Sequence, residues 1–341
     1  MFLWIVAFVG FQAAYGRWTL ESFDIGELDG DLLDNHFEQW LTEFAVNFDD
    51  EEHEYRKRVW KENFHLVHSH NNDKSQSYKL AMNHFAAMTF SEFQEMFHLM
   101  APQPGCSATD RKNWSATSFT DIPDSYDWRD HNVLSKVKNQ GKCGSCWAFS
   151  TTGGLEARAA IHKNMKLLLS EQQLIDCAGN FDTHGCNGGL PSHAFEYIKY
   201  NGGVMTESDY PYKAKSGKRC LFDTGAPTLV QVKHSVNITS YDEDSLTAAI
   251  ATQGPVSIAY HVGKDFMLYH KGVYATSGCP NTSADVNHAV LAVGYGTELG
   301  VPYYVVKNSW GTTFGLDGYF KIKRGVNMCG LSVCNSFPIL N

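Results

Sequence analysis

The chemistry of the sequence centres on Cys146, His288 and Asn308, which are separated by 142 and 20 residues along the chain. A cysteine attacks a carbonyl carbon as its thiolate, which is scarce at neutral pH because a free thiol has a pKa of about 8.5. A helix beginning at Cys146 and a protonated His288 would both favour the thiolate. His288 could then protonate the departing amine, and the side-chain oxygen of Asn308 could fix the orientation of the imidazole. The three residues therefore predict nucleophilic cleavage of amide bonds.

Two more side chains can support this chemistry. Gln140 lies six residues before Cys146, so its amide N–H could join the backbone N–H of Cys146 in stabilising an oxyanion. Trp310 follows Asn308 by two residues and could shield the hydrogen bond between Asn308 and His288 from water. The predicted catalytic set is Gln140, Cys146, His288 and Asn308, supported by Trp310, and it needs neither a metal nor a cofactor.

Each of these residues also has an ordinary interpretation. Cys143 and Cys146 form a C-x-x-C pair that could bind zinc or act in redox chemistry, but the sequence has no second C-x-x-C. Taken alone, His288 would be a strand histidine, Asn308 a turn residue and Trp310 a core aromatic residue. The order Gln, Cys, His, Asn, with a Trp two residues after the Asn, favours catalysis because the matches are improbable together.

The segment that carries these residues shows helical periodicity first and strand patterns later. This order predicts an α+β fold. A helix is expected over 147–162, and strands are expected over 256–261, 286–293, 303–307 and 319–323.

The N-terminus has the features of a secreted chain. Residues 1–16 are apolar and end in Ala-Tyr-Gly, which predicts a cleaved signal peptide, with a short buried helix as the alternative. Glycosylation sequons occur at Asn113, Asn237 and Asn281. Secretion would permit disulfides among the nine cysteines. The expected location is the secretory pathway, either in a lysosome or outside the cell, with no membrane span once the signal is removed.

Acidic and basic residues are distributed unevenly over the rest of the 341-residue chain. Residues 17–121 contain 9 basic and 19 acidic residues, whereas residues 122–341 contain 19 and 18. The total of −9 gives no electrostatic case for nucleic acid as a partner. Apolar periodicity predicts a helix over 37–48, and a mixed polar and apolar stripe predicts a second over 52–71 that packs against another element. Residues 101–121 have a linker composition.

The sequence resembles the papain family of cysteine protease precursors over nearly its whole length, and within that family it is most similar to the cathepsin H branch. The mixed stripe resembles the family's prosegment motif, with Trp60 and Val67 as replacements. The strings that carry the resemblance are Q-G-K-C-G-S-C-W-A-F-S at 140–150, L-S-E-Q-Q-L-I-D-C at 169–177, G-C-N-G-G-L-P at 185–191 and N-H-A-V-L-A-V-G-Y-G at 287–296.

The resemblance implies a papain-like two-domain fold, with a helical left half and a β-barrel-like right half facing each other across a cleft. The implied organisation is a signal peptide at 1–16, a helical inhibitory prosegment at 17–121 and a peptidase domain at 122–341. The prosegment contains a segment at about 102–109 that is similar to the cathepsin H mini-chain. A disulfide between Cys106 and Cys334 would retain this segment after activation.

The resemblance also assigns roles to other positions. Backbone groups of Gly188 and Gly189 would bind an extended substrate, and Thr109 would bind the substrate's α-amino group after cleavage of the chain there. The implied apolar pocket consists of Leu190, Pro191, Ala259, Val286 and Ala289. The other implied disulfides are Cys143 to Cys186, Cys177 to Cys220 and Cys279 to Cys329, whereas sequence alone allows 105 pairings of eight cysteines.

Two departures from the family pattern stand out. The prosegment motif G-x-N-x-F-x-D appears with Ala81 first and Ala87 last, so its carboxylate is missing. Phe314 replaces the family's second tryptophan.

Three functions follow from the resemblance. The expected activity is that of a lysosomal-type aminopeptidase, with an endopeptidase of the cathepsin L type as the main alternative and an inactive binding module as a remote one. The expected partners are peptide and protein substrates, the chain's own prosegment and cystatin-type inhibitors, and the expected state is a monomer.

Overall fold

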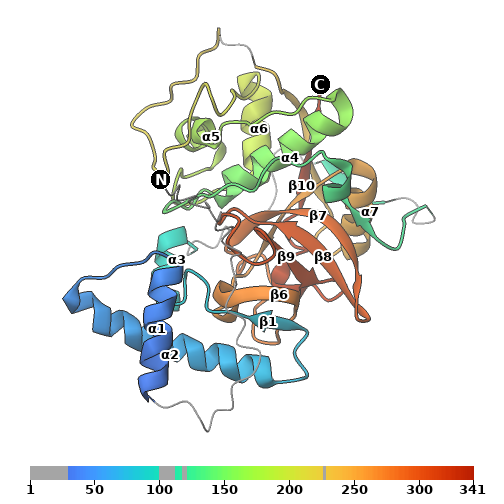
Figure 1. The fold of residues 1–341 in the computed structure, drawn as a ribbon. Helices are drawn as coiled ribbons and strands as arrows, with labels where there is room; N and C mark the ends of the chain where they lie inside the picture. The colour runs from blue at the N-terminus through green and yellow to red at the C-terminus, as the bar shows by residue number, and fades with distance from the viewer. Residues whose placement is uncertain (1–29, 100–111, 117–120, 226–227) are drawn as a thin grey trace, which may run out of the picture.

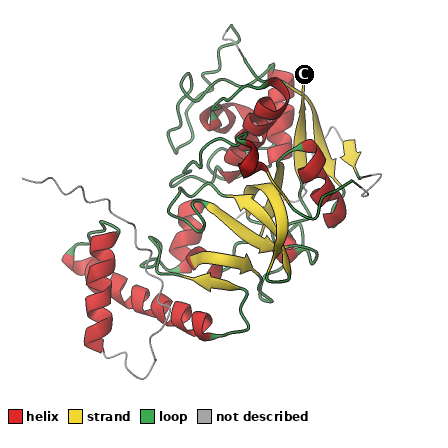
Figure 2. Cartoon of the chain, turned by 45° about the vertical axis from the view of Figure 1, so that its right-hand side comes forward, coloured by secondary structure: helices red, strands yellow, loops and turns green. Residues whose placement is uncertain are grey.

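The computed structural model describes residues 30–99, 112–116, 121–225 and 228–341 (Figure 1). The predicted signal peptide, Cys106 and Thr109 lie outside the described residues. We call residues 122–341 the catalytic part and the described residues before 122 the N-terminal segment. Figure 2 shows the helices of the catalytic part gathered at one end, the strands below them and a separate helical pair to one side.

The helical pair belongs to the N-terminal segment and consists of α1 (Gly30–Glu43) and α2 (Asp50–Asn72), which cross in Figure 1. Phe37 of α1 packs against Trp60 of α2 with ring centroids 5.8 Å apart. Both predicted helices are confirmed, but the first ends earlier than its apolar periodicity suggested. Ala45 adopts a left-handed conformation, and the Asp49 side chain then caps α2.

The mixed stripe on α2 makes the expected contacts with the rest of the N-terminal segment. The guanidinium of Arg56 pairs with Glu52 at 2.7 Å and with Glu92 at 2.9 Å. It also donates to the backbone carbonyl of Ala87, the position at which the family's carboxylate is missing. The Asn63 amide donates to two further backbone carbonyls at 2.8 and 3.0 Å. Although position 87 lacks the family's carboxylate, this face of α2 is held by the ion pairs of Arg56 and by the hydrogen bonds of the Asn63 amide.

Two short elements connect the N-terminal helices to the catalytic part. Strand β1 (Tyr78–Leu80) pairs antiparallel with β6 (Tyr269–Tyr274). Helix α3 (Phe90–Phe97) begins with a capping box formed by Thr89 and Glu92. The N-terminal segment therefore adds β1 to the catalytic sheet, and the aromatic residues of α3 pack on Trp310.

The helical half of the catalytic part contains α4 (Cys146–Lys163), α5 (Glu171–Cys177) and α6 (Pro191–Asn201). Disulfides Cys143–Cys186 and Cys177–Cys220 tie its loops together, and Cys279–Cys329 lies in the strand-rich half. These are three of the pairings that the resemblance implies. Helix α4 is buried along most of its length, which is why it lacks a simple amphipathic pattern.

The strand-rich half is one sheet in the order β1-β6-β9-β8-β7-β5-β10-β4-β2, with β3 paired to β7. Helix α7 (Glu243–Gln253) lies beside it (Figure 1). The remaining strands are β2 (Lys112–Trp114), β3 (Tyr126–Asp127), β4 (Val232–Ile238), β5 (Val256–Tyr260), β7 (His288–Glu298), β8 (Val301–Lys307), β9 (Tyr319–Lys323) and β10 (Ser336–Leu340). The α+β prediction is confirmed.

One strand prediction and the linker prediction need correction. Strand β7 begins at His288, two residues later than expected, and continues to Glu298 because it forms a hairpin with β8. Leu299 and Gly300, both with positive φ, close that hairpin. The linker prediction was wrong at residues 112–114, which form β2 parallel to β4, with Trp114 packed on Phe337 at 5.9 Å.

Two large apolar clusters form the core, one in the helical half and one under the sheet. The second cluster also includes aromatic residues of the N-terminal helices, so the N-terminal segment shares the core of the strand-rich half. Within the described ranges, no helix is both long and apolar enough to cross a membrane.

Candidate active site

Cys146 is the first residue of α4, so the positive end of that helix lies at its sulfur. The backbone N–H of Ala289, from the strand-rich half, points at Sγ from 3.5 Å. The loop before the helix is held by the Cys143–Cys186 disulfide and by a hydrogen bond from Gly144 N to the carbonyl of Cys186 at 2.8 Å. A Cβ at Gly144 would lie 2.4 Å from that carbonyl oxygen, so this approach requires glycine.

The β7–β8 hairpin brings His288 and Asn308 together. His288 is the first residue of β7, and Asn308 directly follows the end of β8. Nε2 of His288 lies 2.9 Å from Oδ1 of Asn308, and both side chains are buried. The 20-residue spacing in sequence therefore becomes a direct hydrogen bond.

The backbone fixes the protonation pattern of this pair. Oδ1 of Asn308 also accepts a hydrogen bond from the backbone N–H of Ser309 at 2.8 Å. Because a backbone N–H can only donate, the atom it faces must be the amide oxygen. The proton in the hydrogen bond with His288 must then sit on Nε2, which leaves Nδ1 of the neutral ring as a base. Nδ1 is buried and has no hydrogen-bond partner in the described part of the chain.

Trp310 covers the imidazole as the sequence suggested. Its ring stacks on His288 with centroids 4.6 Å apart and an interplanar angle of 24°. Phe314, the residue in place of a second tryptophan, packs edge-on against Trp310 at 4.8 Å and is fully buried. The smaller ring therefore preserves the apolar cover.

Gln140 is fully buried and anchored from both ends of its amide. Its Nε2 donates to the carbonyl of Cys143 at 2.9 Å, and its Oε1 accepts from the Ser309 hydroxyl at 2.6 Å. An amide nitrogen carries two hydrogens, so the second hydrogen of Nε2 can serve an oxyanion. Ser309 links Gln140 to Asn308, and the only sequence signal for this link was its place between Asn308 and Trp310.

Burial acts against ionisation of the catalytic pair in this closed structure. It raises the pKa of the Cys146 thiol, although three backbone N–H groups around the sulfur oppose the increase. Burial also lowers the pKa of His288 to about 4, and the hydrogen bond with Asn308 offsets only part of this shift. A high thiol pKa and a low imidazole pKa both favour the neutral pair over a thiolate and an imidazolium.

The N-terminal segment supplies part of this burial. Phe97 of α3 stacks on Trp310 at 4.9 Å, and Phe93 meets the same ring edge-on at 5.1 Å. His98 immediately follows α3. A Cβ placed on Gly144 would lie only 2.7 Å from the Cβ of His98, so the two residues are in close contact. The segment therefore packs on both the tryptophan above His288 and the loop beside Cys146.

The predicted substrate-binding residues lie in three places. Gly188 has a φ of +114°, and a Cβ at Gly189 would meet the Trp147 ring at 2.9 Å, so neither position suits a larger residue. Leu190 caps α6 and Pro191 is its first residue. Ala259 and Ala289 lie opposite each other on β5 and β7, and Val286 precedes β7.

One small apolar cluster joins part of the predicted pocket to the C-terminal segment. It consists of Ala259, Val286, Val333 and Cys334. Sequence reasoning did not identify Val333, because its position depends on the fold of the loop after the Cys279–Cys329 disulfide. Cys334 is disulfide-bonded. The partner expected for it, Cys106, lies outside the described residues.

The three sequons lie in different environments. Asn281 is exposed. Asn113 lies in β2, and its register partner is Asn237 on β4. Asn237 is only 5% exposed, and neither of its side-chain atoms has a hydrogen-bond partner among the described residues. A glycan on Asn237 would not fit this arrangement, because the side chain is buried.

Comparisons with known proteins cover both parts of the chain. The family model described as papain family cysteine protease matches residues 122–339, and that of the cathepsin propeptide inhibitor domain matches residues 37–93. Pro-cathepsin H of Bos taurus is 45% identical over 95% of this chain and 96% of its own length. The thiol protease aleurain-like of Arabidopsis thaliana is 52% identical over 85% of this chain and 79% of its own.

Solved structures of precursors show the same fold. The digestive procathepsin L2 proteinase from the larval midgut of Tenebrio molitor superposes with a TM-score of 0.84 at 35% identity, covering 90% of this chain and all of that one. The proform of the ragweed pollen allergen Amb a 11 superposes with a TM-score of 0.83 at 34% identity, covering 94% and 97%.

The pKa shifts at the site predict a protected nucleophile in the intact chain. Iodoacetamide reacts with thiolate, so alkylation of Cys146 at pH 6 should be at least roughly tenfold slower in the intact chain than after removal of the prosegment. Mass mapping of the alkylated peptide measures the rate. Equal rates before and after removal would show that the prosegment does not suppress ionisation of Cys146.

Proposed function

The chain belongs to the papain family of cysteine proteases, and from this premise we propose that it is the precursor of a peptidase that acts mainly as an aminopeptidase after activation. It is a cysteine peptidase with an inhibitory prosegment. The observation that carries the aminopeptidase proposal is the position of Cys334, which is disulfide-bonded and packs with Ala259 and Val286 beside the catalytic pair.

The proposed chemistry starts from the neutral pair described above. Nδ1 of His288 takes the thiol proton of Cys146, and the resulting thiolate attacks the carbonyl carbon of the scissile bond. The second N–H of Gln140 and the backbone N–H of Cys146 stabilise the oxyanion. The imidazolium returns its proton to the departing amine as a thioester forms, and water then hydrolyses the thioester with His288 as the base. Asn308 holds the ring in the required tautomer throughout.

The aminopeptidase proposal rests on the disulfide pairing of the cysteines. Of nine cysteines, six form the three described disulfides and Cys146 is the nucleophile. Cys106 is the remaining candidate for the bond to Cys334. A mini-chain at 102–109 tethered there would occupy the acyl side of the cleft, next to the apolar pocket. Cleavage after Thr109 would leave a carboxylate that can pair with the free α-amino group of a substrate.

An endopeptidase of the cathepsin L type is the second candidate. The similarity to the fold of a digestive procathepsin L2 proteinase favours it, and the catalytic residues do not distinguish the two activities. In that case the Cys334 disulfide would only anchor the linker and leave the acyl side open to longer substrates. An inactive binding module is a weaker alternative, because nucleophile, base and orienting amide are all in place.

The proposal extends to processing and partners. Removal of a signal peptide at 1–16 and of most of the segment 17–121 would release the peptidase domain at 122–341. The three described disulfides suit the oxidising secretory pathway, leading to a lysosome or to the outside of the cell. The partners would be peptide and protein substrates and cystatin-type inhibitors, with the enzyme acting as a monomer.

The proposed catalytic roles predict a graded loss of activity. Cys146→Ala should abolish peptide hydrolysis while the chain still folds, and His288→Ala should be nearly as damaging. Asn308→Ala should be milder, because orientation is only part of the effect. The measurement is kcat on a dipeptidyl fluorogenic substrate, with circular dichroism as the folding control. Substantial turnover by Cys146→Ala would refute the mechanism.

The mini-chain predicts selection for a free N-terminus. The processed enzyme should hydrolyse an aminoacyl substrate with a free amine at least about tenfold faster than the same substrate acetylated at nitrogen, because only the free amine can form the ion pair. In Cys106→Ser that preference should vanish and endopeptidase activity should rise. If the wild-type enzyme cleaves the acetylated substrate equally well, the endopeptidase alternative is favoured.

His84 predicts pH-dependent release of the prosegment. This residue contacts the Thr313 hydroxyl at 3.4 Å, and burial lowers its pKa to about 4. The docked form therefore disfavours the charged ring, so docking is strongest above the free value near 6.5 and weakens as pH falls from there towards 4. Between pH 6.5 and 4.5 the activation rate of the wild-type precursor should rise by roughly tenfold through this residue.

The matched control for this prediction is an exposed histidine on α2, His65. His84→Gln should flatten the dependence of the activation rate on pH, whereas His65→Gln should leave it unchanged. A precursor carrying His84→Gln that still activates with the wild-type pH profile would assign the acid response to other groups.

A further inference from the structure

A buried lysine directly precedes the catalytic asparagine. Lys307 is the last residue of β8 and is 8% exposed. Its ammonium donates to two atoms of Ser135, the backbone carbonyl at 2.7 Å and the hydroxyl at 2.9 Å. Neither the proposed chemistry nor the substrate pocket uses this side chain, although a buried lysine is costly unless it is well bonded.

The hydrogen bonds continue from Ser135 into the helical half. The hydroxyl of Ser135 donates to Oε2 of Glu156, a buried residue of α4. Oε1 of Glu156 accepts from Lys138 at 2.8 Å and from the backbone N–H of Leu169 at 2.8 Å. Lys307 is therefore connected through one serine to the helix that begins at Cys146.

A second carboxylate completes the cluster. Lys138 lies 2.6 Å from Oε1 of Glu171 on α5, and the hydroxyl of Thr152 donates to the same oxygen at 2.5 Å. The four charged residues of the cluster are two lysines and two glutamates, so their formal charges cancel when all are ionised. We name this set the interdomain cluster; it consists of Ser135, Lys138, Glu156, Glu171 and Lys307.

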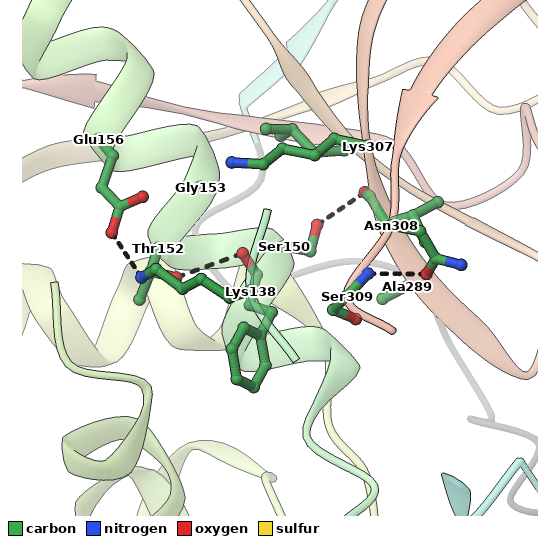
Figure 3. Close-up of a pocket in the computed structure, with 12 residues that line it drawn as sticks. Lys138, Ser150, Thr152, Gly153, Glu156, Ala289, Lys307, Asn308 and Ser309 are labelled. Atoms are coloured by element: carbon green, nitrogen blue, oxygen red, sulfur yellow. Dashed lines mark hydrogen bonds and ion pairs between the residues drawn. The ribbon is translucent and has the colours of Figure 1, made fainter. Parts of the chain in front are cut away.

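The interdomain cluster borders a small cavity next to the catalytic residues. The cavity, of about 20 Å³, is too small for a peptide, and its wall includes Lys307, Asn308 and Ser309 from one half and Lys138 and Glu156 from the other. Figure 3 shows the Lys307 side chain running from its strand towards the helix that carries Glu156, with Asn308 next to it in the chain.

We propose that Lys307 is a positioning residue for Asn308: its bonds to Ser135 hold the end of β8 against the helical half, and so set where Asn308 meets His288 relative to Cys146. The inference rests on the proposed roles of His288, Asn308 and Cys146. The reason is geometric, because nucleophile and base come from different halves and a small displacement between them costs rate.

The charge of Lys307 is compatible with this role at acid and neutral pH. Burial lowers the pKa of Lys307 to about 8, while Glu156 and Glu171 oppose that shift and Lys138 adds to it. Lys307 is therefore still protonated at the pH of an acidic compartment. Burial raises the pKa of Glu171 to about 7, and the attraction of Lys138 opposes that shift.

A double-mutant cycle on the processed enzyme tests the proposal. Lys307→Met should lower kcat by about tenfold and change KM by less than about twofold, because substrate contacts are untouched. In an Asn308→Ala background the same substitution should have little further effect on kcat, since the lysine acts through that asparagine. Lys323→Met, on the neighbouring strand β9, is the matched control and should leave kcat unchanged.

Two outcomes would overturn the proposal. One is an equal loss of kcat from Lys307→Met with and without Asn308, which would make the lysine a purely structural residue. The other is a wild-type kcat in Lys307→Met. If that variant fails to fold, Lys307→Gln replaces it in the cycle, with wild-type kcat again overturning the proposal. If Asn308→Ala alone has no effect on kcat, then the proposed role of Asn308 fails, and this is separate from the outcome for Lys307.

Discussion

The hydrogen bond between His288 and Asn308 is the constraint on which the rest of the site depends. It decides which ring nitrogen carries the proton, and the backbone N–H of Ser309 decides which amide atom faces the ring. A hairpin turn at Leu299 and Gly300 brings the two residues together, and Trp310 then covers the ring. Cys146 is supplied from the other half by the start of α4. The catalytic geometry is therefore a property of the junction between the halves.

The same junction explains how the N-terminal segment controls the enzyme. Helix α3 packs its aromatic residues on Trp310 rather than on the sulfur, and the chain after it passes Gly144. These contacts help to bury the imidazole, and burial lowers the pKa of His288 and raises the pKa of the Cys146 thiol, which favours the neutral pair. The packing of this segment therefore favours the charge state in which Cys146 is a thiol and not a nucleophilic thiolate.

Much of this could be predicted from the sequence, because some signals are local. The two N-terminal helices were visible as periodicity, whereas the start of α4 and the order of the catalytic residues were visible as a motif and its spacing. The strand at 112–114 was not, because its partner β4 lies far along the chain. The early end of the first helix and the extension of β7 depend on the left-handed Ala45 and on the hairpin turn at Leu299 and Gly300, which the apolar pattern does not indicate. The interdomain cluster is the clearest example, since Lys138, Glu156 and Lys307 stand in three unrelated stretches of sequence. No local pattern indicates that a lysine beside a catalytic asparagine should be buried.

The topology of the sheet has a consequence for the life of the protein before activation. Its two outermost strands, β1 and β2, both come from residues before 122, whereas the strands they cover, β6 and β4, belong to the catalytic part. An uncovered edge strand offers unpaired backbone groups to other chains and promotes aggregation. In the precursor, two three-residue strands therefore occupy the edges of the sheet, and the longer strands β6 and β4 have partners on both sides. Loss of the residues before 122 would turn β6 and β4 into edge strands, so the N-terminal segment limits the length of strand edge that the precursor exposes to other chains.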